Sequence, residues 1–160
     1  MNKVYLGKFV STHGLNGELK LISDFDKKEI VYQKDFPLII DNKTYYIASA
    51  RPHKMYELIA LKEYEDINKI DKFINKDVYI NYEDLNLSDN EYLITELLNA
   101  KIIENGKTIG KVTEIIKGVK NDYIKVDNKY LIPIVNKYIK SFDKKEKVLY
   151  TNEAEIFNLK

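Results

Sequence analysis

The sequence predicts a mainly β protein built from two small β-rich domains, with only short helices. Three observations lead to this prediction. Apolar residues alternate with polar ones over many short segments, two-residue turn signals separate these segments, and a polar stretch divides the 160-residue chain near its middle. We therefore expect an N-terminal domain over residues 1–84, a linker over 85–90 and a C-terminal domain over 91–160.

The first domain is expected to contain six short strands. Leu19 and Leu21 alternate with Glu18 and Lys20, which is the period of two of a half-buried strand. The expected strands are residues 4–10, 17–22, 37–41, 44–50, 56–61 and 77–82, with a tight hairpin at residues 42–43 and a break at residues 51–54. So many strands in a short segment favour a small barrel.

Residues 65–74 have a different period. Ile67, Ile70, Phe73 and Ile74 are spaced at helical intervals, and the side chain of Asp66 can cap the first turn. We expect a single helix here, between the last two strands of the first domain.

The second domain begins with a short apolar segment, residues 91–98, which is either helical or extended. Three hairpin signals follow: Asn105-Gly106 is the strongest, because both residues tolerate positive φ, and Asp127-Asn128 and residues 143–146 supply the others. The expected strands are residues 100–104, 107–116, 123–126, 129–132, 137–142 and 147–151. They predict a second compact antiparallel sheet or barrel.

Composition and charge limit the function classes. The chain has no cysteine, which excludes disulfides and thiolate metal sites. It also has no run of about 18 apolar residues that could span a membrane, so we expect a soluble, cytoplasmic protein. The formal net charge of +1 lacks the basic excess of proteins that bind phosphates non-specifically, which favours a protein surface as the main partner.

Residues able to carry catalysis are few. The two histidines, His13 and His53, lie between expected strands, and neither has the partner spacing of a metal site or of a nucleophile–base pair. The sequence contains no glycine-rich phosphate-binding motif. We expect no enzyme activity, no cofactor and no metal, and we keep a small enzyme centred on His13 as the less favoured alternative.

Two loops are candidates for contact with a partner. Gly14 and Gly17 flank the loop after the first strand, where glycine either simply permits positive φ or lets a partner approach the backbone. Asn121 and Asp122 belong to a second such loop, in which their side chains can bond to the backbone. In both loops the structural role is the simpler interpretation.

The apolar strip Tyr92-Leu93-Ile94 directly follows the expected linker. A continuous aromatic and aliphatic stretch at the edge of a domain is either buried as a plug between domains or exposed as a docking patch. The sequence leaves both interpretations open.

Several of these segments together resemble the ribosome maturation factor RimM family. Residues 7–20, GKFVSTHGLNGELK, are similar to its opening signature, and residues 23–25 and 51–54 resemble its next two landmarks. The second half of the sequence resembles the C-terminal PRC-barrel domain of this family at residues 91–92, 96–98, 110–112, 121–122 and 131–133, followed by Asp143. The matching segments extend over nearly the whole chain, and they occur in the same order as in the family.

This resemblance implies a six-stranded barrel similar to those of translation factors, followed by a PRC barrel, with short helices. It implies no reaction. The implied partners are the immature 30S subunit, through small-subunit ribosomal protein nineteen of its head, with a role in head assembly and 16S rRNA processing. We expect a monomer that does not bind membranes; a module that binds 16S rRNA directly is the alternative.

The resemblance also implies which residues bind the partner. A pair of tyrosines at the start of the PRC barrel serves docking in the family; here the first is Tyr92 and the second is replaced by Leu93. We expect Tyr92, Leu93 and Ile94 to form the partner-binding anchor. Secondary contacts are expected from His13, Gly14, Gly17, Asn121 and Asp122, whereas Asn16 replaces a residue that is usually basic in the family.

Overall fold

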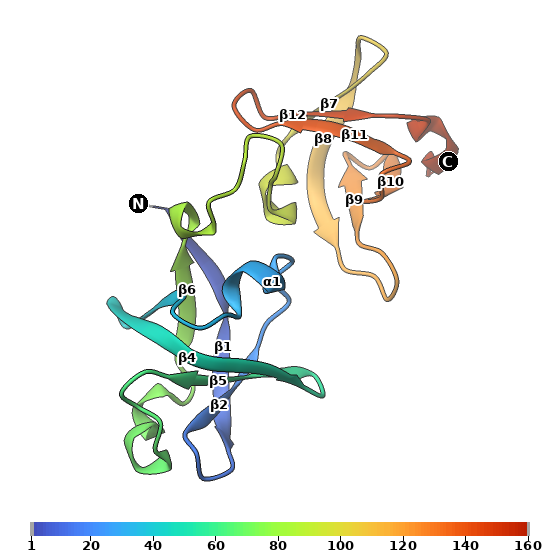
Figure 1. Ribbon diagram of the computed structural model, residues 1–160. Helices are drawn as coiled ribbons and strands as arrows, with labels where there is room; N and C mark the ends of the chain where they lie inside the picture. The colour runs from blue at the N-terminus through green and yellow to red at the C-terminus, as the bar shows by residue number, and fades with distance from the viewer. Residues whose placement is uncertain (1, 160) are drawn as a thin grey trace. The chain divides into compact units, whose positions relative to one another are not determined.

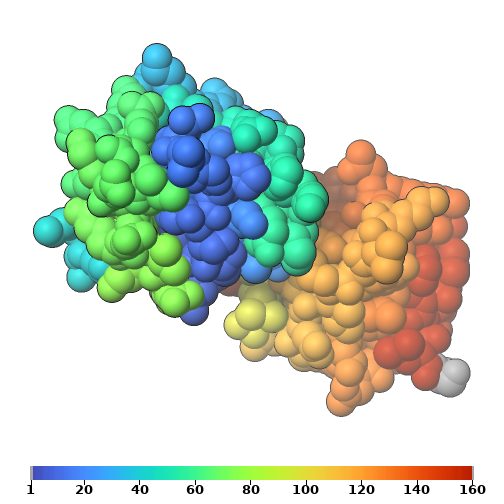
Figure 2. All heavy atoms as spheres, turned by 90° about the horizontal axis from the view of Figure 1, so that it is seen from below, coloured from blue at the N-terminus to red at the C-terminus, as the bar shows by residue number. Residues whose placement is uncertain are grey.

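The structure is a computed structural model that describes residues 2–159. The chain divides into two compact units, Met1–Asn86 and Leu87–Lys160, each built on its own sheet (Figure 1). Each unit is a rounded body in Figure 2, blue to green for the first and yellow to red for the second. The mainly β class predicted from the sequence is confirmed, with one four-residue α-helix and several 3-10 turns as the helices of the described chain.

The N-terminal unit is a closed barrel whose strand order is β1-β2-β5-β4-β3-β6, which confirms the predicted six-stranded barrel. Its interior is filled by large apolar side chains that alternate with outward-facing ones, among them Phe9, Leu19, Leu21 and Leu58. The elements of this unit are β1 Lys3–His13, β2 Glu18–Ile22, α1 Lys28–Val31, β3 Pro37–Ile40, β4 Lys43–His53, β5 Tyr56–Leu61 and β6 Asp77–Asn81.

Strand β1 closes this barrel by pairing with β2 on one edge and with β6 on the other. The register shifts once on each edge, between Phe9 and Ser11 against β2 and between Tyr5 and Gly7 against β6. Such bulges bend and coil a strand, as barrel closure requires. Among the glycines of this unit, Gly7 makes the closest approach to another residue, because a Cβ atom there would be 2.2 Å from the carbonyl oxygen of Ile22.

Two expectations for this unit are wrong. Residues 65–74 form two 3-10 turns, Ile67–Lys69 and Asp71–Phe73, and not one helix. Asp66 does cap the first turn, accepting a hydrogen bond from the Asn68 amide at 3.0 Å, but i→i+3 bonds suit so short a connection better than a full helix. The expected break at residues 51–54 is smaller than predicted, since β4 continues to His53.

The C-terminal unit contains a six-stranded sheet with the order β10-β9-β8-β7-β12-β11. The three predicted hairpins, β7–β8, β9–β10 and β11–β12, are all present. One pairing was not expected: β12 runs parallel to β7, so the sheet is not purely antiparallel. The strands are β7 Lys101–Glu104, β8 Lys107–Ile116, β9 Tyr123–Val126, β10 Tyr130–Pro133, β11 Ile139–Asp143 and β12 Val148–Thr151.

One face of this second sheet forms the core of the unit. Ile102, Val112, Ile124, Phe142 and Leu149 are buried there and belong to one hydrophobic cluster. The predicted apolar segment at residues 91–98 packs on this cluster as a 3-10 turn, Ile94–Leu97, and a second 3-10 turn, Ala154–Phe157, lies near the C-terminus. The opposite face of the sheet carries the residues that face solvent.

The close approach at Gly7 gives a test of barrel closure. We expect Gly7→Ala to lower the free energy of unfolding by about 2 kcal/mol or more, because a backbone carbonyl cannot move aside as a flexible side chain can. Gly106→Ala is the control: it lies in open space in the β7–β8 turn and should cost about 1 kcal/mol, from its left-handed conformation alone. Urea unfolding followed by circular dichroism measures both, and equal losses would contradict the role of Gly7.

Candidate functional site

The imidazole rings of His13 and His53 lie against each other in the N-terminal unit. His13 ends β1 and His53 ends β4, and their ring centroids are 4.7 Å apart with the planes tilted by 49°. The two strands are not neighbours, since β2 and β5 lie between them in the barrel. The coiling of the barrel therefore brings together the two histidines that the sequence left in separate loops.

A bidentate ion pair lies beside the histidine pair. Arg51 donates from Nε and from one terminal nitrogen to the two carboxylate oxygens of Glu18, both at 2.9 Å. This fork geometry is the strong form of the interaction. The Glu18 side chain is mostly buried while that of Arg51 is more than half exposed, so the pair fixes Glu18 and leaves the guanidinium face toward solvent.

The charges around this cluster are predominantly positive. The hydrogen bond from Arg51 is the main cause that lowers the pKa of Glu18, with smaller contributions from both histidines. The pKa of His53 is also lowered, first by desolvation and then by repulsion from His13, Lys54, Arg51 and Lys20. The Lys20 ammonium lies 5.2 Å from the ring centroid of Tyr56, which adds a cation–π contact to this surface.

The loop between β1 and β2 gives its two candidate glycines different roles. Both have positive φ, 68° at Gly14 and 78° at Gly17. A Cβ at Gly14 would meet no atom within 4 Å, whereas one at Gly17 would be 2.5 Å from the Asp66 amide nitrogen. Gly17 thus packs the loop against the segment after β5, and Gly14 is exposed together with Leu15, which is 79% exposed.

The predicted anchor Tyr92-Leu93-Ile94 lies at the start of the C-terminal unit, and its three side chains differ in exposure. Leu93 is buried, with 1% exposed, while Tyr92 and Ile94 are half-buried. The ring of Tyr92 meets Phe142 edge to face at 5.2 Å between centroids. Leu98, four residues after Ile94, adds an exposed aliphatic side chain to the same segment.

Hydrogen bonds hold this segment in place. The Leu93 amide donates to the Glu96 carboxylate at 2.7 Å, and the Glu96 amide donates to the Leu93 carbonyl at 2.9 Å. Upstream, the Lys144 ammonium donates to the carbonyl of Ser88 at 2.9 Å. Reciprocal bonds of this kind pre-organise a short turn, so Tyr92 and Ile94 are displayed from a fixed backbone.

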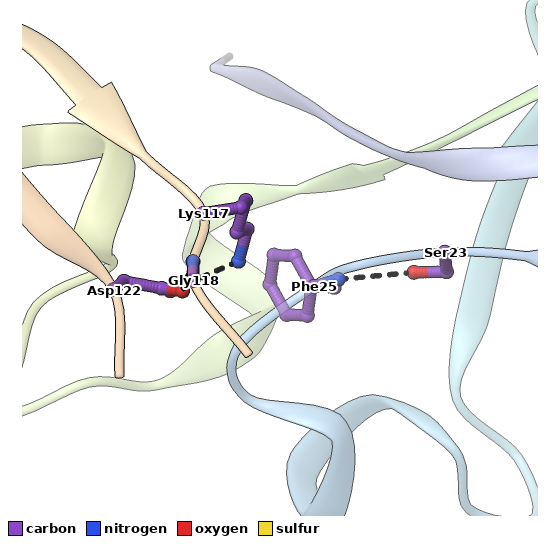
Figure 3. A network of polar contacts seen from close by, with 5 residues as sticks. All are labelled: Ser23, Phe25, Lys117, Gly118 and Asp122. Atoms are coloured by element: carbon purple, nitrogen blue, oxygen red, sulfur yellow. Dashed lines mark hydrogen bonds and ion pairs between the residues drawn. The ribbon is translucent and has the colours of Figure 1, made fainter. Parts of the chain in front are cut away.

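The loop after β8 is organised by Asp122 (Figure 3). Its carboxylate accepts a bond from the Lys117 ammonium at 3.1 Å and from the Gly118 amide at 3.4 Å. A Cβ at Gly118 would be 2.0 Å from the Asn121 carbonyl oxygen, so the loop is tightly folded. Asp122 thus has a structural role in this loop, and Val119 at its tip is fully exposed.

A hydrogen bond between residues close in sequence also shapes the segment after β2 in the N-terminal unit, where the Phe25 amide donates to Ser23 Oγ at 3.2 Å (Figure 3). The Ser23 hydroxyl in turn donates to the carbonyl of Leu6 at 2.6 Å. Residues 23–25 therefore connect the segment after β2 to β1, so their role in this unit is structural.

The structure brings His13 together with His53 and Glu18, and it keeps the Tyr92 segment and the Asp122 loop in the other unit. Sequence reasoning missed the Glu18–Arg51 ion pair, because 33 residues separate the partners and no local pattern links them. It also missed the Phe142 ring behind Tyr92. Within residues 2–159, no cluster of three or more His, Cys, Asp or Glu side chains could hold a metal, and no helix is long and apolar enough to cross a membrane.

Comparison with known proteins gives consistent matches. The family model described as RimM N-terminal domain matches residues 4–85. A ribosome maturation factor RimM of Thermosipho africanus is 33% identical over 164 residues, which cover 96% of this chain and 92% of that protein. Its counterpart in Oenococcus oeni is 31% identical over 149 residues, covering 89% and 90% of the two chains.

Among solved structures, a RimM protein of Pseudomonas aeruginosa aligns with 98% of this chain and 100% of its own. The sequence identity is 22% and the TM-score is 0.47. Family membership therefore rests on the sequence matches.

The two loop glycines provide a matched pair of substitutions. Gly14→Ala should lower the free energy of unfolding by about 1 kcal/mol, the cost of a left-handed alanine. Gly17→Ala should cost about 3 kcal/mol or more, because the same strain is joined by overlap with the backbone at residues 64–66. Chemical denaturation measures the difference, and a Gly17→Ala variant as stable as Gly14→Ala would be inconsistent with this packing.

The histidine pair predicts a pH effect. NMR titration should show His53 with a pKa below its ordinary value, and His13→Gln should raise that pKa without fully restoring it, because desolvation is the larger cause. Since the folded protein binds this proton more weakly than the unfolded chain, stability should rise with pH up to about 6.5 and be fully present above it. Lys43→Gln is the control, and a His53 pKa insensitive to His13→Gln would exclude the coupling.

Proposed function

The chain belongs to the RimM family of ribosome maturation factors, and on this premise we propose that it acts as a non-catalytic assembly factor of the small ribosomal subunit. The observation that carries the proposal is the extent of the sequence match, which covers both units of the chain and nearly the full length of the curated relatives. A similarity confined to one unit would support only a shared domain.

In the finer form of the proposal, the protein binds the immature 30S subunit in the cytoplasm through small-subunit ribosomal protein nineteen and promotes head assembly and 16S rRNA processing. It works as a monomer without cofactor or metal. The geometry of the His13 and His53 pair gives no reason to propose a reaction, since its neighbours are an ion-paired Glu18 and cationic side chains.

The segment that begins at Tyr92 is the docking site that we propose. Its half-buried side chains Tyr92 and Ile94, together with exposed Leu98, offer apolar area from a hydrogen-bonded backbone. Leu93 supports this surface from within, because almost none of its side chain is accessible. Few residues usually provide most of the binding energy of an interface, and a pre-organised backbone lowers the entropic cost of binding.

The mechanism follows from binding alone. A factor that binds an assembly-competent arrangement of the subunit more tightly than competing arrangements shifts the population toward it. Each tenfold difference in affinity contributes about 1.4 kcal/mol to this shift, so a modest interface suffices and no covalent bond needs to change.

The docking proposal predicts the effect of one aliphatic side chain. Ile94→Ala should lower the affinity for immature 30S particles about tenfold, because truncating a central aliphatic contact costs about 1–2 kcal/mol. The matched control is Ile156→Ala, which removes the same atoms from an exposed isoleucine in another 3-10 turn of the same unit. Co-sedimentation with particles from cells that lack the factor measures both.

Both variants should unfold at nearly the same denaturant concentration as the parent, which excludes indirect effects. Co-sedimentation unchanged by Ile94→Ala, or reduced equally by Ile156→Ala, would remove this segment as the docking site while leaving the family membership untouched.

A further inference from the structure

Two lysines face each other directly on the open face of the C-terminal sheet. Lys101 on β7 is the registered partner of Lys111 on β8, and both side chains are exposed. Their neighbours Ile102 and Val112 are buried in the core on the opposite face, which fixes the outward direction of both lysines. Directly opposed residues have Cβ atoms about 5 Å apart, so the two ammonium groups share one small area.

This arrangement is unfavourable for the isolated protein. Like charges directly opposite on neighbouring strands destabilise a sheet. Among the described residues, neither Lys101 nor Lys111 forms an ion pair or side-chain hydrogen bond that would offset the repulsion. A third lysine lies close by: Lys147 directly precedes β12, and its carbonyl accepts the amide of Lys101 at 3.1 Å.

An aromatic ring lies next to the lysine pair on the same face. Val148 of β12 is the registered partner of Lys101, and Tyr150 is the partner of Ile103, one position further along this face. Tyr150 is 37% exposed, and Ile103 and Val148 are half-buried. We call the surface of Lys101, Ile103, Lys111, Val148 and Tyr150 the lysine–tyrosine face.

The acidic residues near this face are occupied elsewhere or lie at its margin. Glu104 accepts bonds from the Thr151 hydroxyl at 2.8 Å and the Ala154 amide at 3.1 Å, which hold it away from the lysines. Asp143 is the partner of Val148 at the far end of the row, and its carboxylate accepts the Glu146 amide at 3.0 Å. Asp127 follows β9; its amide bonds to the Lys111 carbonyl, and its carboxylate lies against Gly110, where a Cβ atom would be 2.6 Å from Oδ2. Asp127 therefore lies at the margin beside Lys111, but among the described residues it forms no ion pair with either lysine, so the area that the two ammonium groups share keeps a positive charge.

We propose that the lysine–tyrosine face binds single-stranded RNA, with Lys101 and Lys111 holding a phosphate and Tyr150 stacking on an unpaired base. A phosphate between the two ammonium groups converts their repulsion into attraction to a shared anion. A base can stack on the ring only where it is unpaired, which is why a single strand and not a duplex fits this face. The face extends the proposed function, since a ribosome maturation factor works on particles rich in RNA.

The test measures binding of the full-length protein to a fluorescein-labelled oligouridylate of about twelve nucleotides by anisotropy, over a range of salt. Lys101→Gln with Lys111→Gln should weaken binding about fivefold at about 0.1 M salt and flatten the log–log salt slope by about 0.7, which is the contribution of the one phosphate that the two lysines share on a single strand. The control is Lys120→Gln with Lys129→Gln, which removes the same charge from exposed lysines near β9 and β10 of the same unit.

The ring is tested by a second matched pair. Tyr150→Phe keeps a stacking surface and should bind like the parent, whereas Tyr150→Ile keeps a strand-forming side chain without a ring and should bind about tenfold more weakly.

A third variant separates the effect on RNA binding from the effect on stability. Lys111→Glu places opposite charges across β7 and β8, so its melting temperature should equal or exceed that of the parent while RNA binding is lost.

Equal losses in the control lysine pair, or no loss in the Lys101 and Lys111 pair, would overturn the proposal. It would also be overturned if these variants bound RNA normally but lost a ribosomal protein after nuclease treatment, because the face would then serve a protein. The outcome is independent of the docking proposal. Naked RNA reports only on the lysine–tyrosine face, and Ile94→Ala in the co-sedimentation assay reports only on the Tyr92 segment.

Discussion

The close approach of Gly7 to the carbonyl of Ile22 is the constraint on which the N-terminal barrel depends. Strand β1 must pair along both edges, and it does so by coiling through a bulge on each side. That coiling carries the end of β1 to the end of β4, where His13 meets His53 and Glu18 meets Arg51. The polar cluster is therefore a consequence of how the barrel closes.

The C-terminal unit uses its sheet differently. One face is covered by a hydrophobic cluster and by the turn that begins after Leu93, while the other presents the lysine–tyrosine face. An apolar segment suits a protein partner, and a positive face with a ring suits RNA. In the two proposals a single small unit thus offers one surface to a protein and another to RNA, and both surfaces are held by backbone hydrogen bonds.

Groups that carry or can take up positive charge lie close together at two places. His53 lies against His13, where desolvation and then the neighbouring cationic groups lower its pKa, and Lys101 lies directly opposite Lys111 across two strands. Natural proteins retain such unfavourable contacts where a ligand offsets them. The apolar interior, by contrast, has almost no polar side chains, with Thr151 the one buried polar residue described.

The sequence by itself determined the strands and the tight turns, because alternation and turn residues such as Asn105-Gly106 act within a few residues. It also identified Asp66 as a cap, although not the 3-10 form of the turns that follow. Only the tertiary structure decided the parallel pairing of β12 with β7, the burial of Leu93 and the meeting of Lys101 with Lys111. These depend on register and packing between segments distant in the chain, which no local pattern encodes.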